Sequence, residues 1–227
     1  KAIRRQRQMC IRDRHTSVCA DQRRALEVSD IGNLLCETEK ASSCGSLPIE
    51  LQTTKNIFAL MFLLRGIPFV DLAYLRKADI QGNTLKYRRR KTGRLLTVML
   101  TPDAIKLIRI VAKTKPESPY LFPFLSSPEG TEAAYHEYQS SLRMFNYRLS
   151  RLKKYMKTAA HLSSYTIRHT WATMAYYCEI HPGIISEAMG HSSIKVTETY
   201  LKPFQNEKID NANSQVISYV KEYASIV

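Results

Sequence analysis

Apolar residues recur at helical spacing along most of this chain, and capping signals mark where several helices begin. A helix is expected from about Asp30. The apolar run 49–64 predicts a buried helix that ends at Gly66. Thr101 and Pro102 supply an N-cap and a first-turn proline for the next long run. Four helices are predicted at about 132–157, 165–178, 183–189 and 193–201, and a last one near 212–224.

Alternation of apolar and polar residues appears in the middle of the chain. "TLKYRRR" (84–90) and "LLTVML" (95–100) flank "KTGR" (91–94), and a turn at "QGN" follows a short strand near residue 80. This pattern predicts a small antiparallel sheet whose last hairpin carries Lys91 and Gly93 at its tip. The predicted fold class is therefore mainly α with a small antiparallel β-sheet, an α+β domain.

The charge of the chain indicates which classes of molecule it binds. Its 227 residues carry 34 Lys and Arg against 20 Asp and Glu, a net charge of +14. Such an excess favours a polyanion, which is either nucleic acid or an anionic membrane face. The longest apolar run, 57–64, is far too short to span a bilayer, so no membrane insertion is expected.

The cysteine and histidine patterns do not predict a metal site. Five cysteines form an odd count without a C-x-x-C pair, and the six histidines form no H-x-x-x-H or H-E-x-x-H pattern. We interpret the cysteines as reduced thiols in a cytoplasmic protein, and we expect no metal and no cofactor.

The first residues differ from the rest in character. Residues 1–14 contain six basic residues and one acidic residue, and "MCIRDR" resembles the translated end of a transposase adapter used in sequencing libraries. We expect segment 1–22 to be unstructured or artefactual, and the alternative for 1–14 is a solvated basic tail. Without residues 1–14 the net charge is still +9.

Four residues in the rest of the chain form a chemically consistent set. Arg168 lies in the first turn of a predicted helix whose core face is Ile167, Trp171, Met174 and Cys178, where helix N–H groups favour an anion. His191 follows Gly190 in a short turn, Lys91 tops the hairpin, and Tyr200 ends a short helix. A phenol is a poor nucleophile at neutral pH, so its attack on a phosphodiester needs cations around the phosphate and an acid for the leaving oxygen.

Each residue also has an ordinary structural interpretation. An arginine at a helix start is usually an ion-pair partner, a lysine in "RRRKTGR" is usually solvated, and a Gly-His pair is usually a helix C-cap. Tyr200 is one of thirteen tyrosines. The residues therefore carry an inference about function only as an ordered set.

As an ordered set they resemble the tyrosine recombinase (phage integrase) family. "YTIRHTWAT" (165–173) is similar to the family block H-x-x-R-H-T-x-A-T, and "EAMGHSSIKVTETY" (187–200) to its L-G-H-S-S…Y block, with the same nine-residue step from histidine to tyrosine. "LAYLRKADI" and "KTGR" stand where the family has its first arginine region and its catalytic lysine. The resemblance covers about residues 23–227, and "RGIPFVDLAYL" is most similar to integrases of Bacteroides-type mobile elements.

The chain departs from the family at two positions. Tyr165 stands where the family usually has a histidine three residues before the arginine, and a phenol is a poor acid or base near pH 7. Pro68, the expected first residue of a helix, stands where the family has its first arginine, three residues before Asp71. Arg65 lies three residues further back, about 4.5 Å along a helical backbone, and is our candidate substitute.

The resemblance implies a recombinase catalytic domain at 23–227, without the N-terminal core-binding domain of full-length relatives. It implies that Tyr200 forms a 3′-phosphotyrosyl link, that Arg168, His191 and Arg65 hold the phosphate, and that Lys91 is the acid. The residues expected to bind double-stranded DNA are Arg88, Arg89, Arg90, Arg94 and His169. It further implies a homotetramer on DNA that exchanges C-terminal helices, in the bacterial cytoplasm.

Two other functions stay open. One is a DNA-binding module of the same fold that has lost its chemistry, since Pro68 and Tyr165 depart from the family pattern. The other is a topoisomerase IB-like enzyme that nicks and closes DNA with the same residue set. The target sequence and the direction of the reaction are not encoded in any motif that we recognise.

Overall fold

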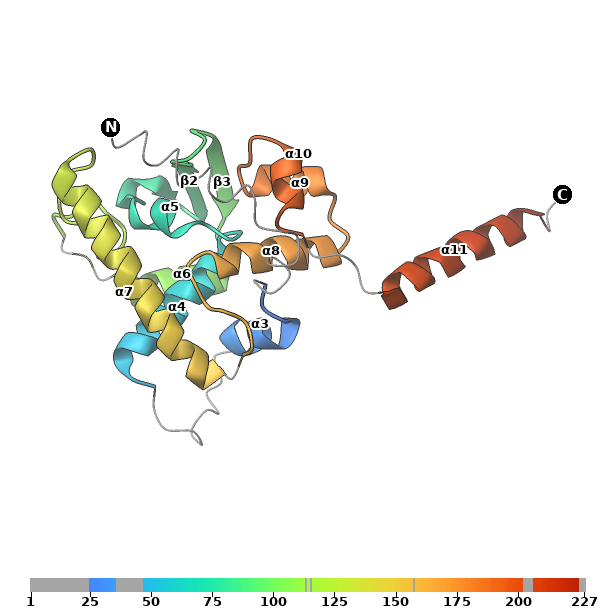
Figure 1. Ribbon diagram of the computed structural model, residues 1–227. Helices are drawn as coiled ribbons and strands as arrows, with labels where there is room; N and C mark the ends of the chain where they lie inside the picture. The colour runs from blue at the N-terminus through green and yellow to red at the C-terminus, as the bar shows by residue number, and fades with distance from the viewer. Residues whose placement is uncertain are drawn as a thin grey trace.

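Helices make up most of the described chain, with one small sheet among them (Figure 1). The computed structural model describes residues 25–35, 47–112, 114, 116–156, 158–201 and 206–224, so the predictions for 1–22 and for 41–46 lie outside it. The helices are α3 (Val28–Leu35), α4 (Ile49–Leu63), α5 (Phe69–Ala73), α6 (Pro102–Val111), α7 (Glu132–Met156), α8 (Thr166–Tyr177), α9 (Pro182–Ala188), α10 (Ile194–Glu198) and α11 (Asn206–Ala224). A short 3₁₀ helix (Lys77–Asp79) precedes the strands β1 (Ile80–Gln81), β2 (Thr84–Arg88) and β3 (Leu95–Met99). The predicted fold class, mainly α with a small antiparallel sheet, is confirmed.

Two predicted helix boundaries between α4 and α5 differ from the structure. Helix α4 ends at Leu63 rather than running to Gly66, because Arg65 and Gly66 both adopt the left-handed conformation, with φ of 60° and 66°. Pro68 is the N-cap of α5 in extended conformation rather than its first helical residue. The reversal between the two helices is therefore concentrated in two consecutive left-handed residues.

The sheet has the order β1-β2-β3, and both pairs are antiparallel. Thr84 pairs with Met99 and Arg88 with Leu95, so the loop 89–94 is the predicted hairpin tip. Side chains alternate along both strands: Leu85, Tyr87, Leu96 and Val98 are buried, while the residues between them are exposed or half-buried. One face of the sheet therefore covers the core and the other meets solvent.

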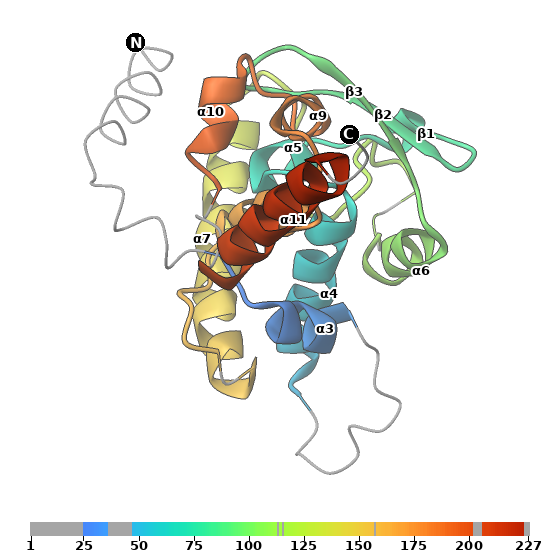
Figure 2. The ribbon, with the colours of Figure 1, turned by 90° about the vertical axis from the view of Figure 1, so that its right-hand side faces the viewer.

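Helix α4 is central to the main core. It packs against α3, α6, α7 and α8 (Figures 1 and 2). Its residues Phe58, Leu60 and Met61 are fully buried. Phe69 joins α5 to α7 by stacking on Phe145, with ring centroids 4.8 Å apart. This core fixes α8 against α4, and α8 carries the predicted site residues Arg168 and His169.

The prediction of which α8 residues face the core is largely wrong. Ile167 is fully buried, but Trp171 and Met174 are half-buried and Cys178 is exposed. The buried face instead holds small and hydroxyl-bearing residues together with Arg168, which is 1% exposed. The buried residues of α8 are Thr166, Ile167, Arg168, His169, Thr170, Ala172, Thr173 and Ala175. Large apolar residues usually mark the face of a helix that packs on the core, but the buried face of α8 carries a charged residue instead.

Helix α11 projects away from the rest of the domain (Figures 1 and 2). It begins at Asn206, six residues before the predicted start, and Lys208 near its beginning donates a hydrogen bond to the Tyr177 carbonyl at 2.8 Å. Four of its apolar residues are exposed: Ile209 by 53%, Val216 by 62%, Ile217 by 45% and Val220 by 59%. Its apolar face is thus left uncovered by the described part of this chain.

Three further findings concern membrane insertion, the cysteines and metal binding. No helix of the described residues is long and apolar enough to cross a membrane. Cys178 is a free thiol, and the other four cysteines lie outside the described residues. Within the described residues no group of three or more His, Cys, Asp or Glu side chains is arranged to hold a metal ion.

Candidate active site

Tyr200 lies just after α10, and it is 9% exposed. Its ring stacks on His191, with centroids 5.0 Å apart, and on the other side it lies 4.5 Å from the ring of His169. Its backbone carbonyl accepts a hydrogen bond from Thr173 of α8 at 3.1 Å. The tyrosine is therefore held by α8 and by the turn after α9, which carry Arg168 and His191.

Arg168 points into the domain beneath this tyrosine. Its Nη1 donates to the Gly66 carbonyl at 2.9 Å, and its Nη2 lies 2.6 Å from the Met189 carbonyl and 2.8 Å from Nε2 of His191. Its Cζ is 5.9 Å from the centroid of the Tyr200 ring. Burial, followed by the charge of Arg89, lowers the pKa of Arg168, although a guanidinium stays protonated at neutral pH.

The tautomer of His191 follows from its partners. A guanidinium can only donate, so Nε2 of His191 accepts from Arg168 and the ring proton is on Nδ1, which faces Thr197 Oγ1 at 2.8 Å. Burial, with the charges of Arg168, Arg89 and Lys91, lowers the pKa of His191 to about 3. The imidazole is therefore neutral at physiological pH.

The hairpin tip is fastened to the turn that carries His191. Thr92 donates to the Gly190 carbonyl at 3.2 Å, and Arg94 donates to the His191 carbonyl at 3.0 Å. Lys91 is exposed at this tip, and its charge contributes to lowering the pKa of His191. The lysine is thus close to His191 and exposed to solvent.

The four arginines predicted to bind DNA have different environments. Arg88 is exposed, whereas Arg90 stacks on Tyr74 at 3.7 Å and forms a 2.5 Å ion pair with Glu129. Arg94 holds the His191 turn. Arg89 is 4% exposed and donates from Nη1 to the Met189 carbonyl at 2.5 Å. Arg89 therefore lies inside the site rather than on its surface.

His169 and Tyr165 also lie in the site. His169, predicted to contact DNA, is 4% exposed and packs against the rings of both Tyr165 and Tyr200. Tyr165 is 43% exposed, and its hydroxyl hydrogen-bonds to the hydroxyl of Tyr200. Desolvation, followed by the charge of Tyr200, raises the pKa of Tyr165 well above its ordinary value. Tyr165 is consequently a neutral hydrogen-bonding partner for the tyrosine that we expect to react.

Arg65 is half-buried at the reversal between α4 and α5. Its charge, like those of Arg168 and Arg89, lowers the pKa of Tyr87, while burial raises that pKa by more. Arg65 precedes Gly66, whose carbonyl accepts a hydrogen bond from Arg168. No hydrogen bond or ion pair of its side chain occurs within the described residues.

Asp71 is a site-lining carboxylate that sequence reasoning missed. It is 3% exposed, and its Oδ1 accepts the backbone N–H of Arg90 at 2.9 Å. Burial raises the pKa of Asp71, and the charges of Arg89, Arg168 and Arg90 oppose this shift. An acidic residue within an otherwise apolar run, "PFVDLAYL", was the available signal for a buried carboxylate.

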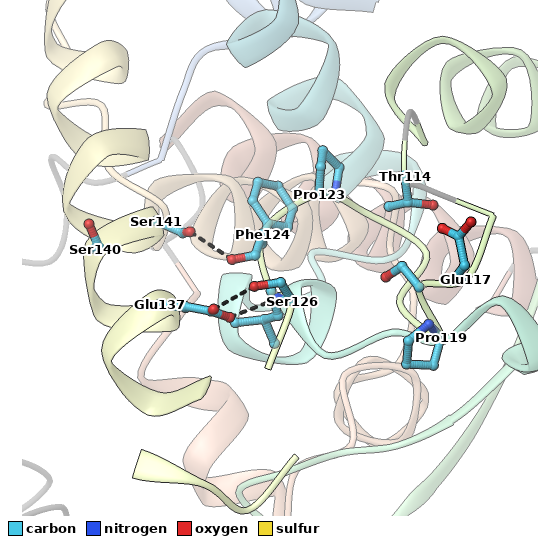
Figure 3. A pocket seen from close by; sticks show the side chains of 11 residues that line it. Thr114, Glu117, Pro119, Pro123, Phe124, Ser126, Glu137, Ser140 and Ser141 are labelled. Carbon is cyan, nitrogen blue, oxygen red and sulfur yellow. Dashed lines mark hydrogen bonds between the residues drawn. The ribbon is translucent and has the colours of Figure 1, made fainter. Parts of the chain in front are cut away.

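A separate hollow of about 690 Å³ lies between α7 and the proline-containing loop 116–128 that follows α6 (Figure 3). There Glu137 accepts hydrogen bonds from Ser126 and Ser127, which close the loop onto the helix. Against the effect of burial, which alone would raise it, these bonds lower the pKa of Glu137 to about 2. None of the predicted catalytic residues lines this hollow, so it is distinct from the site around Tyr200.

Comparison with known proteins identifies the family of the chain. The sequence pattern of the phage integrase family matches residues 30–207, which is most of the chain. The chain therefore belongs to the phage integrase family. No protein with a curated description matches it.

Several solved structures share the fold. One is XerA recombinase, which is 18% identical with a TM-score of 0.57; the match covers 84% of this chain and 64% of that one. Another is the Tn1549 transposon integrase (residues 82–397) with circular intermediate DNA, which is 15% identical with a TM-score of 0.54; the match covers 85% of this chain and 66% of that one. A third is XerH site-specific recombinase in a post-cleavage complex with palindromic difH substrate, which is 16% identical with a TM-score of 0.57; the match covers 84% of this chain and 52% of that one. This chain thus spans less than two thirds of each relative, and at these identities the likeness defines the fold alone.

Proposed function

We propose that this chain is the catalytic domain of a site-specific DNA recombinase that cleaves and rejoins DNA through a 3′-phosphotyrosyl intermediate. Membership of the phage integrase family supports site-specific recombination in general. The observation that carries the finer proposal is the meeting of Tyr200, Arg168 and His191 within one hydrogen-bonded and stacked cluster, beside the lysine-bearing hairpin.

In this proposal each residue has a defined task. The Tyr200 oxygen attacks the phosphorus as its hydroxyl proton passes to solvent water, and the bond from phosphorus to the 5′ oxygen breaks while Lys91 gives that oxygen a proton. Arg168 and His191 donate to the phosphate oxygens as negative charge develops on them. Because its ring proton is on Nδ1, His191 can donate from Nε2 only when that nitrogen both is released from Arg168 and gains a proton. Both changes become easier once an anion has entered, because the two charges that most lower its pKa are then neutralised.

No nucleotide or metal enters this scheme, because the bond energy is retained in the covalent link. A 5′-hydroxyl from another strand attacks the phosphotyrosine, releases Tyr200 and restores a phosphodiester. Arg65 stays a predicted contributor to phosphate binding, and Arg88, Arg90 and Arg94 stay predicted DNA contacts. Arg90 must first leave Glu129 to serve as one.

We propose double-stranded DNA as the partner and a homotetramer as the working assembly. The supporting observation is the uncovered apolar face of α11, which projects from the body and which a neighbouring copy would cover. We also propose a Bacteroides-type mobile element as its source and the bacterial cytoplasm as its location, on the resemblance of "RGIPFVDLAYL" given above.

The test of the function is a covalent adduct on nicked suicide duplexes with a randomised core, resolved on a denaturing gel. Parent protein should form the adduct, and Tyr200→Phe should form none while keeping its fold, because only the nucleophilic oxygen is removed. Tyr176→Phe on α8 is the matched control and should react like the parent. Adduct formation by Tyr200→Phe would assign the nucleophile to another residue.

One alternative keeps a specific observation in its favour. Pro68 and Tyr165 depart from the family pattern, which fits a DNA-binding module that has lost its chemistry. Such a module would bind the duplex pool in a salt-dependent manner and give no covalent band with the parent protein. The same gel therefore separates the two functions. A topoisomerase IB-like enzyme would instead form the adduct and relax supercoiled DNA as a single protomer.

A further inference from the structure

Two buried arginines share one acceptor in the site. Arg168 and Arg89 are 1% and 4% exposed, and both donate to the Met189 carbonyl, at 2.6 and 2.5 Å. Their donating nitrogens are therefore no more than about 5 Å apart, a separation at which like charges repel. Side chains from β2's hairpin and from α8, far apart in sequence, are thus brought to a single point.

The local fold explains why Arg89 points inward. Side chains alternate along β2, so the buried Leu85 and Tyr87 are followed on the same face by Arg89, while Arg88 faces solvent. Gly190 leaves the space that this side chain occupies: a Cβ there would lie 3.0 Å from Arg89 Cδ, and its φ of +65° suits glycine. The turn that carries His191 is thus shaped around the Arg89 side chain.

The charges of this pair are incompletely compensated. The Nε atoms of Arg89 and Arg168 are both buried, and neither has a hydrogen-bond partner among the described residues. Asp71 is the carboxylate whose titration both arginines influence, and it already accepts from the backbone of Arg90. The two buried guanidiniums thus face one buried carboxylate, and their positive charge is not fully balanced. Unused donors and unbalanced charge both indicate an anion.

We infer that Arg89 is a catalytic residue that binds the scissile phosphodiester together with Arg168, as the second guanidinium of the phosphate site. This inference rests on the proposed function, and it assigns to Arg89 the task that the sequence suggested for Arg65. Arg89 shares an acceptor with Arg168 and is fixed by buried contacts. Arg65 is half-buried at a strained reversal without a partner among the described residues.

The first test measures anion binding without DNA, using inorganic phosphate and the thermal unfolding midpoint. A ligand that binds only the folded state raises this midpoint. Phosphate should raise it in the parent, and Arg89→Met, which keeps the side-chain volume, should lose most of the shift. Lys86→Met is the matched control, since it removes one positive charge from the outward face of the same strand and should keep the shift. A parent without a shift, or an Arg89→Met variant with the parental shift, overturns the inference.

The second test uses the duplex that the parent captures from the randomised pool, remade with a methylphosphonate at the mapped cleavage position. This group is neutral, so it no longer needs two cations. Arg89→Met should slow adduct formation about 10²- to 10³-fold on the phosphate and much less on the methylphosphonate, and Arg89→Lys should be intermediate. Lys91→Ala should stay equally slow on both substrates, because its task is to protonate the leaving oxygen.

The outcomes separate this inference from the proposed function. If the parent forms no adduct, the proposed function fails, and the phosphate shift still decides whether Arg89 binds an anion. If the parent reacts but Arg89→Met is equally defective on both substrates, Arg89 has only a structural role. If Arg65→Met shows the charge-dependent defect and Arg89→Met does not, the second guanidinium is Arg65 and the inference is wrong.

Discussion

Gly66 links the fold to the site, so its replacement is a sensitive test of the geometry. The residue has a φ of 66°, and a Cβ on it would lie 3.0 Å from Arg168 Cα and 3.2 Å from Trp171 Cβ. Its carbonyl accepts from Arg168 Nη1 at 2.9 Å. Gly66→Ala should therefore destabilise the protein and displace the arginine at the same time.

Two costs add in this variant. A left-handed conformation costs a residue with a side chain about 1–2 kcal/mol, and an extra methyl group in a packed interface costs about 1–3 kcal/mol. Gly82→Ala isolates the first cost, because Gly82 has a φ of 59° and no atom within 4 Å of its Cβ position. The difference between the two variants should thus be about 1–3 kcal/mol. The free energy of unfolding of a domain, about 5–15 kcal/mol, tolerates either change.

Urea unfolding followed by tryptophan fluorescence suits this comparison. The chain has one tryptophan, and Trp171 lies beside Gly66. Gly66→Ala should have the lower midpoint with an unchanged denaturant slope, and its emission in the folded state should differ from that of the parent. Equal midpoints for Gly66→Ala and Gly82→Ala would show that the close approach of Gly66 to α8 does not exist.

Three shorter predictions concern the residues around this point. Arg65→Gly should raise the free energy of unfolding by about 1 kcal/mol, since it relieves a left-handed residue with φ of 60°; a lower urea midpoint would contradict this. Tyr165→Phe removes the hydrogen bond to the Tyr200 hydroxyl and should slow adduct formation about tenfold, the equivalent of about 1.4 kcal/mol. Burial and three nearby charges lower the pKa of His191 from 6.5 to about 3, so the unfolded state takes up the proton first. The free energy of unfolding should hence fall as pH drops below about 6.5, and it should fall less in His191→Asn. Parallel pH profiles of this free energy for the parent and the variant would refute the prediction.

Local signals explain which parts of the fold the sequence could predict. The start of α6 is confirmed, since Thr101 Oγ1 accepts from Ala104 N at 3.3 Å and Pro102 begins the helix. The hairpin around Lys91 is confirmed for the same reason, because alternation and turn residues act over a few positions. The start of α11 was placed six residues late because its first turn, "NEKID", has one apolar residue and so no detectable period.

The burial of α8 depends on tertiary structure, and the sequence could not give it. Apolar spacing placed Trp171 and Cys178 in the core, but the helix turns Arg168 inward because the carbonyls of Gly66 and Met189 are there to receive it. Those carbonyls come from two distant reversals of the chain. The inward position of Arg89, by contrast, was readable: Leu85, Tyr87 and Arg89 share one phase of the strand alternation.

A phosphate site made of two buried arginines should reduce the stability of the unoccupied protein. In Arg89→Met the Met189 carbonyl keeps its bond from Arg168, so no acceptor is orphaned, and the repulsion between two buried cations disappears. Replacing buried charges by apolar groups of similar volume is often neutral or stabilising by about 1–4 kcal/mol. Arg89→Met should therefore unfold at the parental urea concentration or above it, while losing phosphate binding. A loss of more than about 2 kcal/mol would mean that Arg89 holds the hairpin to the His191 turn as a structural residue. Higher stability together with lost anion binding is the combination that only a functional charge explains.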